Sequence, residues 1–169
     1  MKVPRIWCWV SRCARTCGYR RPPRPRWRLL AATVILNPSA SDEIIGKADY
    51  RRSLISNQSA RLYCAYAYAD ASEGESTTDM VFAGENLVYE NGSKLAATKL
   101  LTCDMAIADV DLDRLVAERR RSTTWTGADD APESTTVEFS FEGVLTDEPV
   151  LRDALGIDRV FPARLCRPT

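Results

Sequence analysis

The dipeptide Asn91-Gly92 is the sequence feature that most constrains how this chain folds. Asn and Gly tolerate the positive φ angles that a two-residue hairpin turn requires. The dipeptide lies between Leu87–Glu90 and Lys94–Ala97, two short runs that suit strands. We therefore expect an antiparallel hairpin over residues 87–97.

Three further elements are expected before this hairpin. Thr33–Asn37 (TVILN) is apolar and β-branched, which suits a buried strand, and Tyr63–Ala69 (YCAYAYA) is expected to form another. Between them, Lys47–Tyr63 has the pattern of an amphipathic helix. Its apolar side is expected to hold Leu54, Ile55 and Leu62, and its polar side Arg51, Arg52 and Arg61.

The remaining pattern is weaker. Met80–Ala83 and Asn86–Glu90 are expected to be strands separated by a turn at Gly84, and Met105–Leu112 alternates like a half-buried strand. Leu112–Arg121 is expected to be a short charged helix. Beyond Ser122, the sequence indicates one strand at Thr136–Phe141 and a helix at Asp147–Gly156.

Composition divides the chain into three parts. A length of 169 residues suits one domain, and the equal totals of 23 basic and 23 acidic residues give no general argument for a nucleic-acid or membrane partner. The charge is uneven, because Met1–Arg28 is basic and has no acid. We expect a disordered or out-of-frame segment at 1–30, a folded region at 31–121 and a linker-like tail at 122–169.

Histidine is absent, which excludes Ser-His-Asp and Cys-His catalysis as well as zinc bound by histidine. The six cysteines form no CxxC pair, so no metal site is expected. Pro4 and Arg5 interrupt the apolar stretch at the start, which is too short for a signal or a membrane span. We therefore expect a cytoplasmic protein with reduced thiols.

Four segments resemble one family in their order and spacing. They are Asn37–Lys47 (NPSASDEIIGK), Ala48–Arg61 (ADYRRSLISNQSAR), Ala65–Asp79 (AYAYADASEGESTTD) and Tyr89–Leu95 (YENGSKL). The series is similar to the glutamine-dependent NAD synthetases of bacteria. Ala108–Arg121 resembles the segment that follows in that family, so the resemblance covers roughly residues 32–121.

The resemblance implies an α/β fold: the C-terminal half of a glutaminase domain, which is a nitrilase-like αββα sandwich of the carbon–nitrogen hydrolase type. Half of such a sandwich leaves sheet edges and apolar faces uncovered. The family's glutaminase domain releases ammonia from glutamine, and a synthetase domain uses that ammonia to amidate adenylated deamido-NAD. The full enzyme uses ATP and magnesium. We expect neither that domain nor any cofactor in this chain.

The resemblance also implies two glutamine-binding residues. The second serine of the SAS motif is Ser41, and the basic residue after the glycine is Lys47. A hydroxyl at a strand end and a cation can hold the head group of an amino acid. The alternatives are a local turn or cap hydrogen bond for Ser41 and a solvated helix start for Lys47.

The family's catalytic residues are not legible in this sequence. Its Glu–Lys–Cys triad hydrolyses glutamine through a cysteine nucleophile. The resemblance places the Glu and Lys well upstream of Thr33, where this chain has no room for them, and places the Cys in a C-E-D-x-W-x-P motif. Cys13 and Cys17 lie in the right neighbourhood, but neither is followed by Glu-Asp. We therefore assign no catalytic residue and expect a fragment that is inactive alone.

A shifted reading frame accounts for this loss. Cys13–Arg20 (CARTCGYR) can be encoded by codons that translate as C-E-D-V-W-V-P when they are read from the third base of the Cys13 codon. The same shift at Arg164–Thr169 allows F-V-P followed by Ser or Thr and Asp, which resembles the family's continuation. The hypothesis is that both ends are translated out of frame, as in a pseudogene or a miscalled gene.

Two other functions are weighed against this one. The first is a different carbon–nitrogen hydrolase, with Cys13 or Cys17 as nucleophile and Glu73 or Glu75 as base. The structural alternative for the two acids is a solvated loop. The second is a nucleic-acid-binding protein with a basic arm at Arg20–Arg28. We favour the glutaminase domain of the glutamine-dependent NAD synthetases over both, and we expect no nucleic-acid partner.

Overall fold

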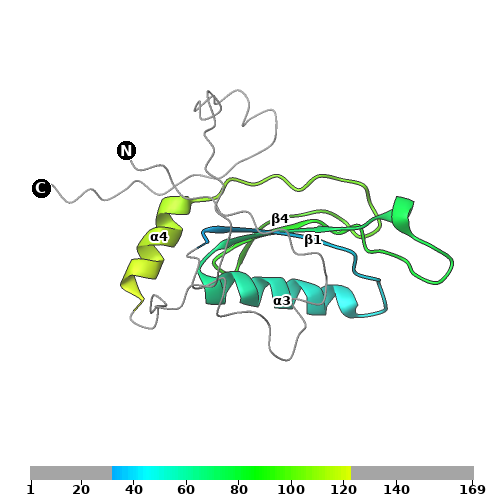
Figure 1. Ribbon diagram of the computed structural model, residues 1–169, viewed down its shortest axis with the longest axis horizontal. Coiled ribbons are helices and arrows are strands. Elements are labelled where there is room, and N and C mark those ends of the chain that lie inside the picture. Colours follow the sequence, from blue (N-terminus) through cyan, green and yellow to red (C-terminus); the bar gives the residue numbers. More distant parts are fainter. Residues whose placement is uncertain (1–31, 123–169) are drawn as a thin grey trace, which may run out of the picture. The chain divides into compact units, whose positions relative to one another are not determined.

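A computed structural model describes residues 32–122, in which one layer is a β-sheet and the other is helical (Figure 1). Four strands form a single sheet in the order β1-β2-β3-β4. The elements are β1 (Val34–Ser39), α3 (Lys47–Leu62), β2 (Ala65–Asp70), the 3-10 helix η1 (Glu73–Glu75), β3 (Leu87–Glu90), β4 (Ser93–Ala97) and α4 (Leu112–Arg121).

Strands β1 and β2 are parallel, and α3 is the crossover that joins them. The remaining pairs, β2 with β3 and β3 with β4, are antiparallel. Parallel strands need such a long connection, because the chain must return to the same end of the sheet before the second strand starts. The carboxyl ends of β1 and β2 therefore lie together, with Ser39 opposite Asp70.

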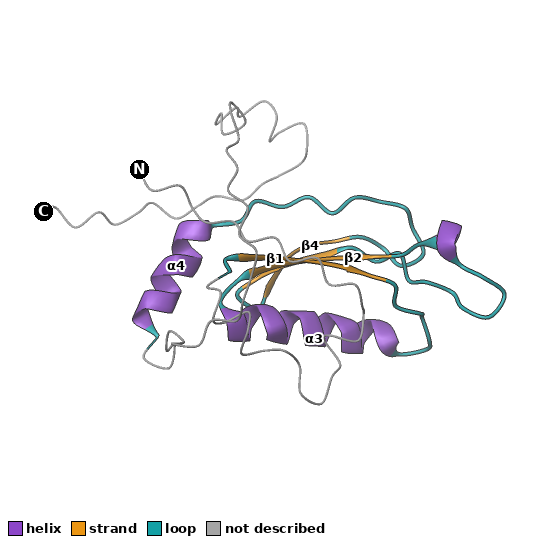
Figure 2. Ribbon diagram, viewed as in Figure 1, coloured by secondary structure: helices purple, strands orange, loops and turns teal. Residues whose placement is uncertain are grey.

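The core lies between α3 and one face of the sheet (Figure 2). Side chains alternate between faces along a strand, and the register puts Ile35, Tyr66 and Tyr89 on the same face. This face packs against Ile55 and Leu62 of α3. Full burial of each large side chain contributes about 1.5–3 kcal/mol, so this layer is the main source of stability.

Helix α3 matches the expected Lys47–Tyr63 helix but ends at Leu62, with Tyr63 in the left-handed region (φ 46°). The expectation that Arg51 lies on the polar side was wrong, because Arg51 is buried. Its guanidinium reaches acidic partners inside the protein, so helical position alone did not decide its exposure.

The hairpin at Asn91-Gly92 is confirmed. Both residues have positive φ, at 45° and 85°, between β3 and β4. A Cβ on Gly92 would lie 3.0 Å from the Cβ of Ala60, so the turn packs closely against α3. Glycine is needed here for its φ angle and for this close approach.

Two expected strands are wrong. In Met80–Ala83, only Phe82 forms an isolated bridge, with Asp42. Met105–Leu112 forms no strand before α4 begins. This part of the chain runs along the sheet face opposite α3 and does not join an edge (Figures 1 and 2). Its alternating sequence does not correspond to a half-buried strand, because the apolar Met105 and Ile107 are 80% and 40% exposed.

Helix α4 is confirmed at Leu112–Arg121. Asp111 caps its start by accepting from the Arg114 backbone N–H at 2.9 Å. Near its end, the buried Arg119 donates to the carbonyls of Ala32, Leu62 and Tyr63. Two of these carbonyls belong to the C-terminal end of α3, where a cation is favoured by the helix dipole. One arginine thus joins α4, α3 and the start of β1.

The basic segment 1–30, the expected strand at Thr136–Phe141, the expected helix at Asp147–Gly156 and the proposed out-of-frame tail lie outside the described residues. Among residues 32–122, no helix has the length and apolar character needed to cross a membrane.

Candidate functional site

Polar side chains gather where the parallel strands β1 and β2 end. Ligands commonly bind outside the carboxyl ends of parallel strands, because the loops there are free to present functional groups. Ser39 and Asp70 are the last residues of the two strands, and Ser41 follows β1. Of the two expected glutamine-binding residues, Ser41 thus lies just after the carboxyl end of β1, and Lys47 is the first residue of α3.

Ser41 is held against the neighbouring strand. Its backbone N–H donates to Oδ1 of Asp70 at 2.7 Å. Its hydroxyl lies beside the hydroxyl of Tyr68, which also neighbours Ser39. This backbone bond joins segments 29 positions apart and fixes the start of the loop 40–47 on β2.

Lys47 closes the other end of this loop. Its ammonium donates to the backbone carbonyl of Asp42 at 2.5 Å and to the Asp42 carboxylate at 2.6 Å. These contacts lower the pKa of Asp42 through the hydrogen bond and the positive charge of Lys47. The Lys47 side chain is 24% exposed, so it lies at the protein surface with its charge already partly satisfied.

Below the loop lies a buried cluster of ionic side chains that the sequence patterns did not indicate. Glu85 is fully buried and binds Arg51 at 3.1 Å and Arg52 at 2.5 Å. Arg51 also binds Glu43 of the loop at 2.7 Å. Buried charges require such partners, since taking an ion out of water without one is strongly unfavourable. The four-residue cluster fixes the guanidinium of Arg51 beneath the strand ends.

Three buried polar atoms near this cluster have no hydrogen-bond partner within the described residues. They are Ser39 Oγ, Arg51 Nη1 and Asp70 Oδ2. Burial raises the pKa of Asp70, although the Ser41 N–H and the charge of Arg51 oppose the rise. Burial also raises the pKa of Tyr68 to about 12, so its hydroxyl stays protonated at neutral pH. Of these groups, Ser39 and Asp70 have the Tyr68 hydroxyl as a neighbour, whereas Arg51 Nη1 is left with unused bonding capacity within the described residues.

The acids of the competing hydrolase hypothesis lie elsewhere. Glu73 and Glu75 are exposed on η1. Their solvated position agrees with the structural alternative of a loop that carries acids on the surface. Cys13 and Cys17, the nucleophiles of that hypothesis, lie outside the described residues.

The two described cysteines form no disulfide and differ in burial. Cys64 is fully buried, and burial raises the pKa of its thiol to about 12 despite the charge of Arg119. A thiol of this kind is a poor nucleophile. Cys103 is exposed, with its sulfur 3.4 Å from the Ser72 hydroxyl. Among the described residues, no group of three or more His, Cys, Asp and Glu side chains could hold a metal ion.

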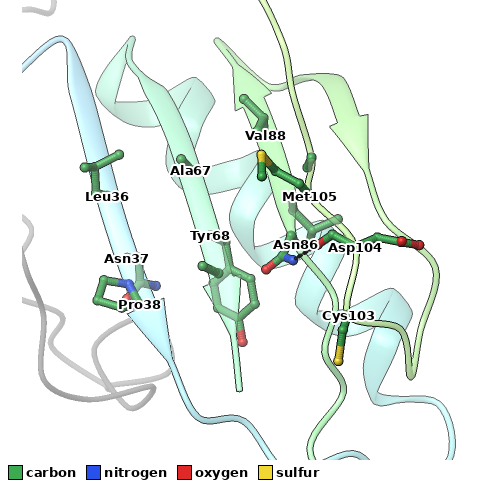
Figure 3. A pocket seen from close by; sticks show the side chains of 13 residues that line it. Leu36, Asn37, Pro38, Ala67, Tyr68, Asn86, Val88, Cys103, Asp104 and Met105 are labelled. Atoms are coloured by element: carbon green, nitrogen blue, oxygen red, sulfur yellow. Dashed lines mark hydrogen bonds between the residues drawn. The ribbon is translucent and has the colours of Figure 1, made fainter. Parts of the chain in front are cut away.

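A hollow lies on the sheet face opposite α3 (Figure 3). Leu36, Ala67 and Val88 come from three adjacent strands and share that face, and Met105 lies beside them. Asn86 holds the covering segment by donating to the carbonyl of Asp104 at 2.8 Å. Most of the lining is apolar, with Tyr68, Cys103 and Asp104 as its ionisable residues.

Comparison with known proteins identifies the relatives of this chain. No family model matches it. Over 106 residues, it is 42% identical to the glutamine-dependent NAD(+) synthetases of Mycobacterium tuberculosis (strain ATCC 25618 / H37Rv) and Mycobacterium leprae (strain TN). The aligned part is 62% of this chain but only 16% of each relative, so the chain spans about one sixth of their length.

Solved structures confirm the fold. The structure of glutamine-dependent NAD+ synthetase from Acinetobacter baumannii has a TM-score of 0.56 at 19% identity, covering 64% of this chain and 20% of that one. Nit3 of Saccharomyces cerevisiae, of the nitrilase superfamily, has a TM-score of 0.55 at 13% identity, covering 69% of this chain and 42% of Nit3. The chain is thus related over 106 residues to glutamine-dependent NAD(+) synthetases, and its fold is part of a nitrilase-like domain, as its motifs predicted.

Proposed function

We propose that this chain carries the glutamine-recognition half of the glutaminase domain of a glutamine-dependent NAD synthetase. The 42% identity over 106 residues carries the proposal. The position of Ser41 at the carboxyl ends of two parallel strands supports it, because a head group held there would lie beside the polar cluster. Lys47 would add a cation at the rim of the same loop.

The chain alone is proposed not to hydrolyse glutamine. Hydrolysis in this family needs a Glu, a Lys and a Cys, and no Cys in the sequence is followed by Glu-Asp. Neither described cysteine replaces the nucleophile, because Cys64 is buried and Cys103 is an isolated surface thiol. The amidation of deamido-NAD with ATP and magnesium would belong to a synthetase domain, which the resemblance does not cover. We propose a cytoplasmic setting, with no nucleic-acid partner.

Two measurements on the purified 169-residue chain test this proposal. Isothermal titration with L-glutamine should show binding that Ser41→Ala weakens, with Ser53→Ala on the exposed side of α3 as the matched control. An ammonia assay should show no release above the Ser41→Ala variant. Equal binding by wild type and Ser41→Ala, or ammonia release specific to wild type, would contradict the proposal.

The competing hydrolase makes a different prediction in the same preparation. An electrophile that mimics glutamine would alkylate Cys13 or Cys17, and glutamine would block the reaction. We expect no such protected labelling by peptide mass spectrometry. Protected labelling of either residue would favour the hydrolase and replace our proposal.

A further inference from the structure

We propose that the basic segment Met1–Arg28 docks on an apolar surface of its own chain, at the end of the sheet where α3 begins. This surface, the loop patch, consists of Ile44, Ile45, Val81 and Leu101. The contact is independent of whether the chain binds glutamine. It involves two features that the proposed function leaves unused, the exposed apolar side chains of these loops and the positive charge of the first 28 residues.

Exposed apolar side chains gather on the loop patch. Its four residues come from three separate loops, and each is at least half exposed to solvent. Together with Leu100, they line a hollow of about 650 Å³. This volume lies within the range of about 300–1,000 Å³ that binding pockets occupy. Figure 1 shows the loops that follow β1 and β2 at the end of the sheet where α3 starts. A contiguous exposed apolar surface of this kind marks an interaction site.

The loop patch is a fixed surface, because backbone hydrogen bonds join its loops. The Glu43 N–H donates to the Val81 carbonyl at 2.7 Å. The Leu101 N–H donates to the Ala83 carbonyl, also at 2.7 Å. Leu101 has φ 57°, a left-handed conformation that a leucine seldom adopts. Residues in such conformations persist only where the surrounding structure imposes them, and they cluster at functional sites. The patch is therefore formed before a docking segment arrives.

The charge around the loop patch is negative. The loops 40–46, 71–86 and 98–104 carry seven acids and one base, which are Asp42, Glu43, Glu73, Glu75, Asp79, Glu85 and Asp104 with Lys99. Adding residues 47–52 of α3 gives eight acids and four bases, a net charge of −4. The cations Lys47, Arg51 and Arg52 are already paired with acids of this region. The exposed Glu73 and Glu75 therefore favour a basic partner.

Met1–Arg28 is a segment of this chain with matching chemistry. It carries nine basic residues and no acid, and its apolar residues Ile6, Trp7, Trp9 and Val10 are close together in the sequence. Indole rings bury a large area, so the two tryptophans would enter the hollow of the loop patch. The arginines that follow them would then meet the acids around it. The segment has these properties whichever reading frame encodes it.

Chain length permits this contact for Trp7 and Trp9 but not for Trp27. β1 begins two residues after Ala32 and extends about 20 Å toward the loop patch. Val10 precedes Ala32 by 22 residues, which can span about 70 Å. Trp27 precedes Ala32 by only five residues, or about 18 Å at full extension, so it falls short of the patch. The three tryptophans of the segment should therefore differ in their exposure.

Tryptophan fluorescence of the full chain tests the proposal, because residues 32–122 contain no tryptophan. The first reporter variant is Trp27→Phe/Trp125→Phe, in which Trp7 and Trp9 emit. The second retains Trp27 alone, with phenylalanine at the other three positions. Burial of one large apolar side chain favours the docked form by about tenfold or more, so acrylamide should quench the first reporter at least about threefold less than the second.

Substitutions in the loop patch locate the contact. Ile45→Ser and Leu101→Ser, each introduced into the first reporter, should raise its quenching toward that of the second. Sodium chloride at about 0.5 M should act in the same direction, because it screens the attraction between the arginines and the acids. Met105→Ser is the matched control, since Met105 is an exposed apolar residue outside the patch, and it should change nothing. Circular dichroism establishes that each variant is folded.

Three results would overturn the proposal. Equal quenching of the two reporters would show that Trp7 and Trp9 do not dock. Protection that persists in both Ile45→Ser and Leu101→Ser would place the segment elsewhere on the chain. Protection that appears only as the protein concentration rises would make a second copy of the chain the occupant. If Leu101→Ser does not fold, Ile45→Ser decides, because the Ile45 side chain is fully exposed.

Discussion

Replacing Glu85 with glutamine should destabilise the protein more than any other single charge change described above. Glu85 is fully buried and satisfies both Arg51, which is 5% exposed, and Arg52, which is 36% exposed. Removing one partner of a buried ion pair costs about 3–5 kcal/mol. Arg52 can turn to water and adds about 0–1 kcal/mol, whereas Arg51 keeps Glu43, which reduces its part. We therefore expect a loss of about 3 kcal/mol.

Urea denaturation followed by far-UV circular dichroism measures this loss. With a slope of about 1.5 kcal/mol/M, the midpoint should fall by about 2 M. Glu73→Gln is the control, because Glu73 is exposed on η1. The double variant Arg51→Met/Glu85→Leu should recover much of the loss, since apolar residues can replace a buried ion pair. If the Glu85→Gln midpoint falls no further than that of Glu73→Gln, the buried cluster does not stabilise the fold.

Arg119→Met should lower the free energy of unfolding by about 2–3 kcal/mol, because it leaves buried carbonyls without a hydrogen-bond donor. Urea denaturation measures this loss, and Arg120→Met at an exposed position, the control, should not show it. Gly92→Ala should cost at least about 1 kcal/mol and Gly74→Ala much less, because only the first has positive φ and a close neighbour; equal losses would refute the reasoning. The gene should contain C-E-D-x-W in the alternative frame across Cys13, and nucleotide sequencing that finds none would end the frame-shift hypothesis.

The pH dependence of stability has a definite sign at Cys64. Burial raises its pKa from 9.0 to about 12, so between these values the folded chain keeps a proton that the unfolded chain loses. Stability should therefore fall as pH rises through this range. Cys64→Ala should lose less stability than wild type between neutral and alkaline pH in urea denaturation. An equal loss in both proteins would show that Cys64 does not cause it.

The sequence predicted correctly those elements that depend on interactions between residues close together in the chain. The left-handed turn at Asn91-Gly92 and the helices α3 and α4 are set by residues close together in the chain, and the structure agrees. The strand expected at Met105–Leu112 failed because a strand needs an edge to pair with. That segment lies along a face of the sheet, and its alternating pattern could not distinguish the two environments.

The residues of the candidate site also fall into two groups, those that sequence motifs predicted and those that they did not. Ser41 and Lys47 were predicted because they stand within motifs. Asp70, Arg51 and Glu85 were not, since their roles depend on partners 29 to 34 positions away. Position on the helix suggested that Arg51 was exposed, and only the fold placed Glu85 next to it. Buried charges that pair across elements leave no periodic signal in a sequence, so a structure is needed to find them.

Strand β2 carries large side chains on one face and small side chains on the other. Its tyrosines, Tyr66 and Tyr68, enter the core beneath α3, while Ala65, Ala67 and Ala69 face the other way. Nearly all of the strand's packing energy therefore lies on a single side. Ala67 could be enlarged or labelled to report on whatever approaches the outer surface, and such changes would leave the core intact. The two sides of this strand can thus vary independently in evolution or in the laboratory.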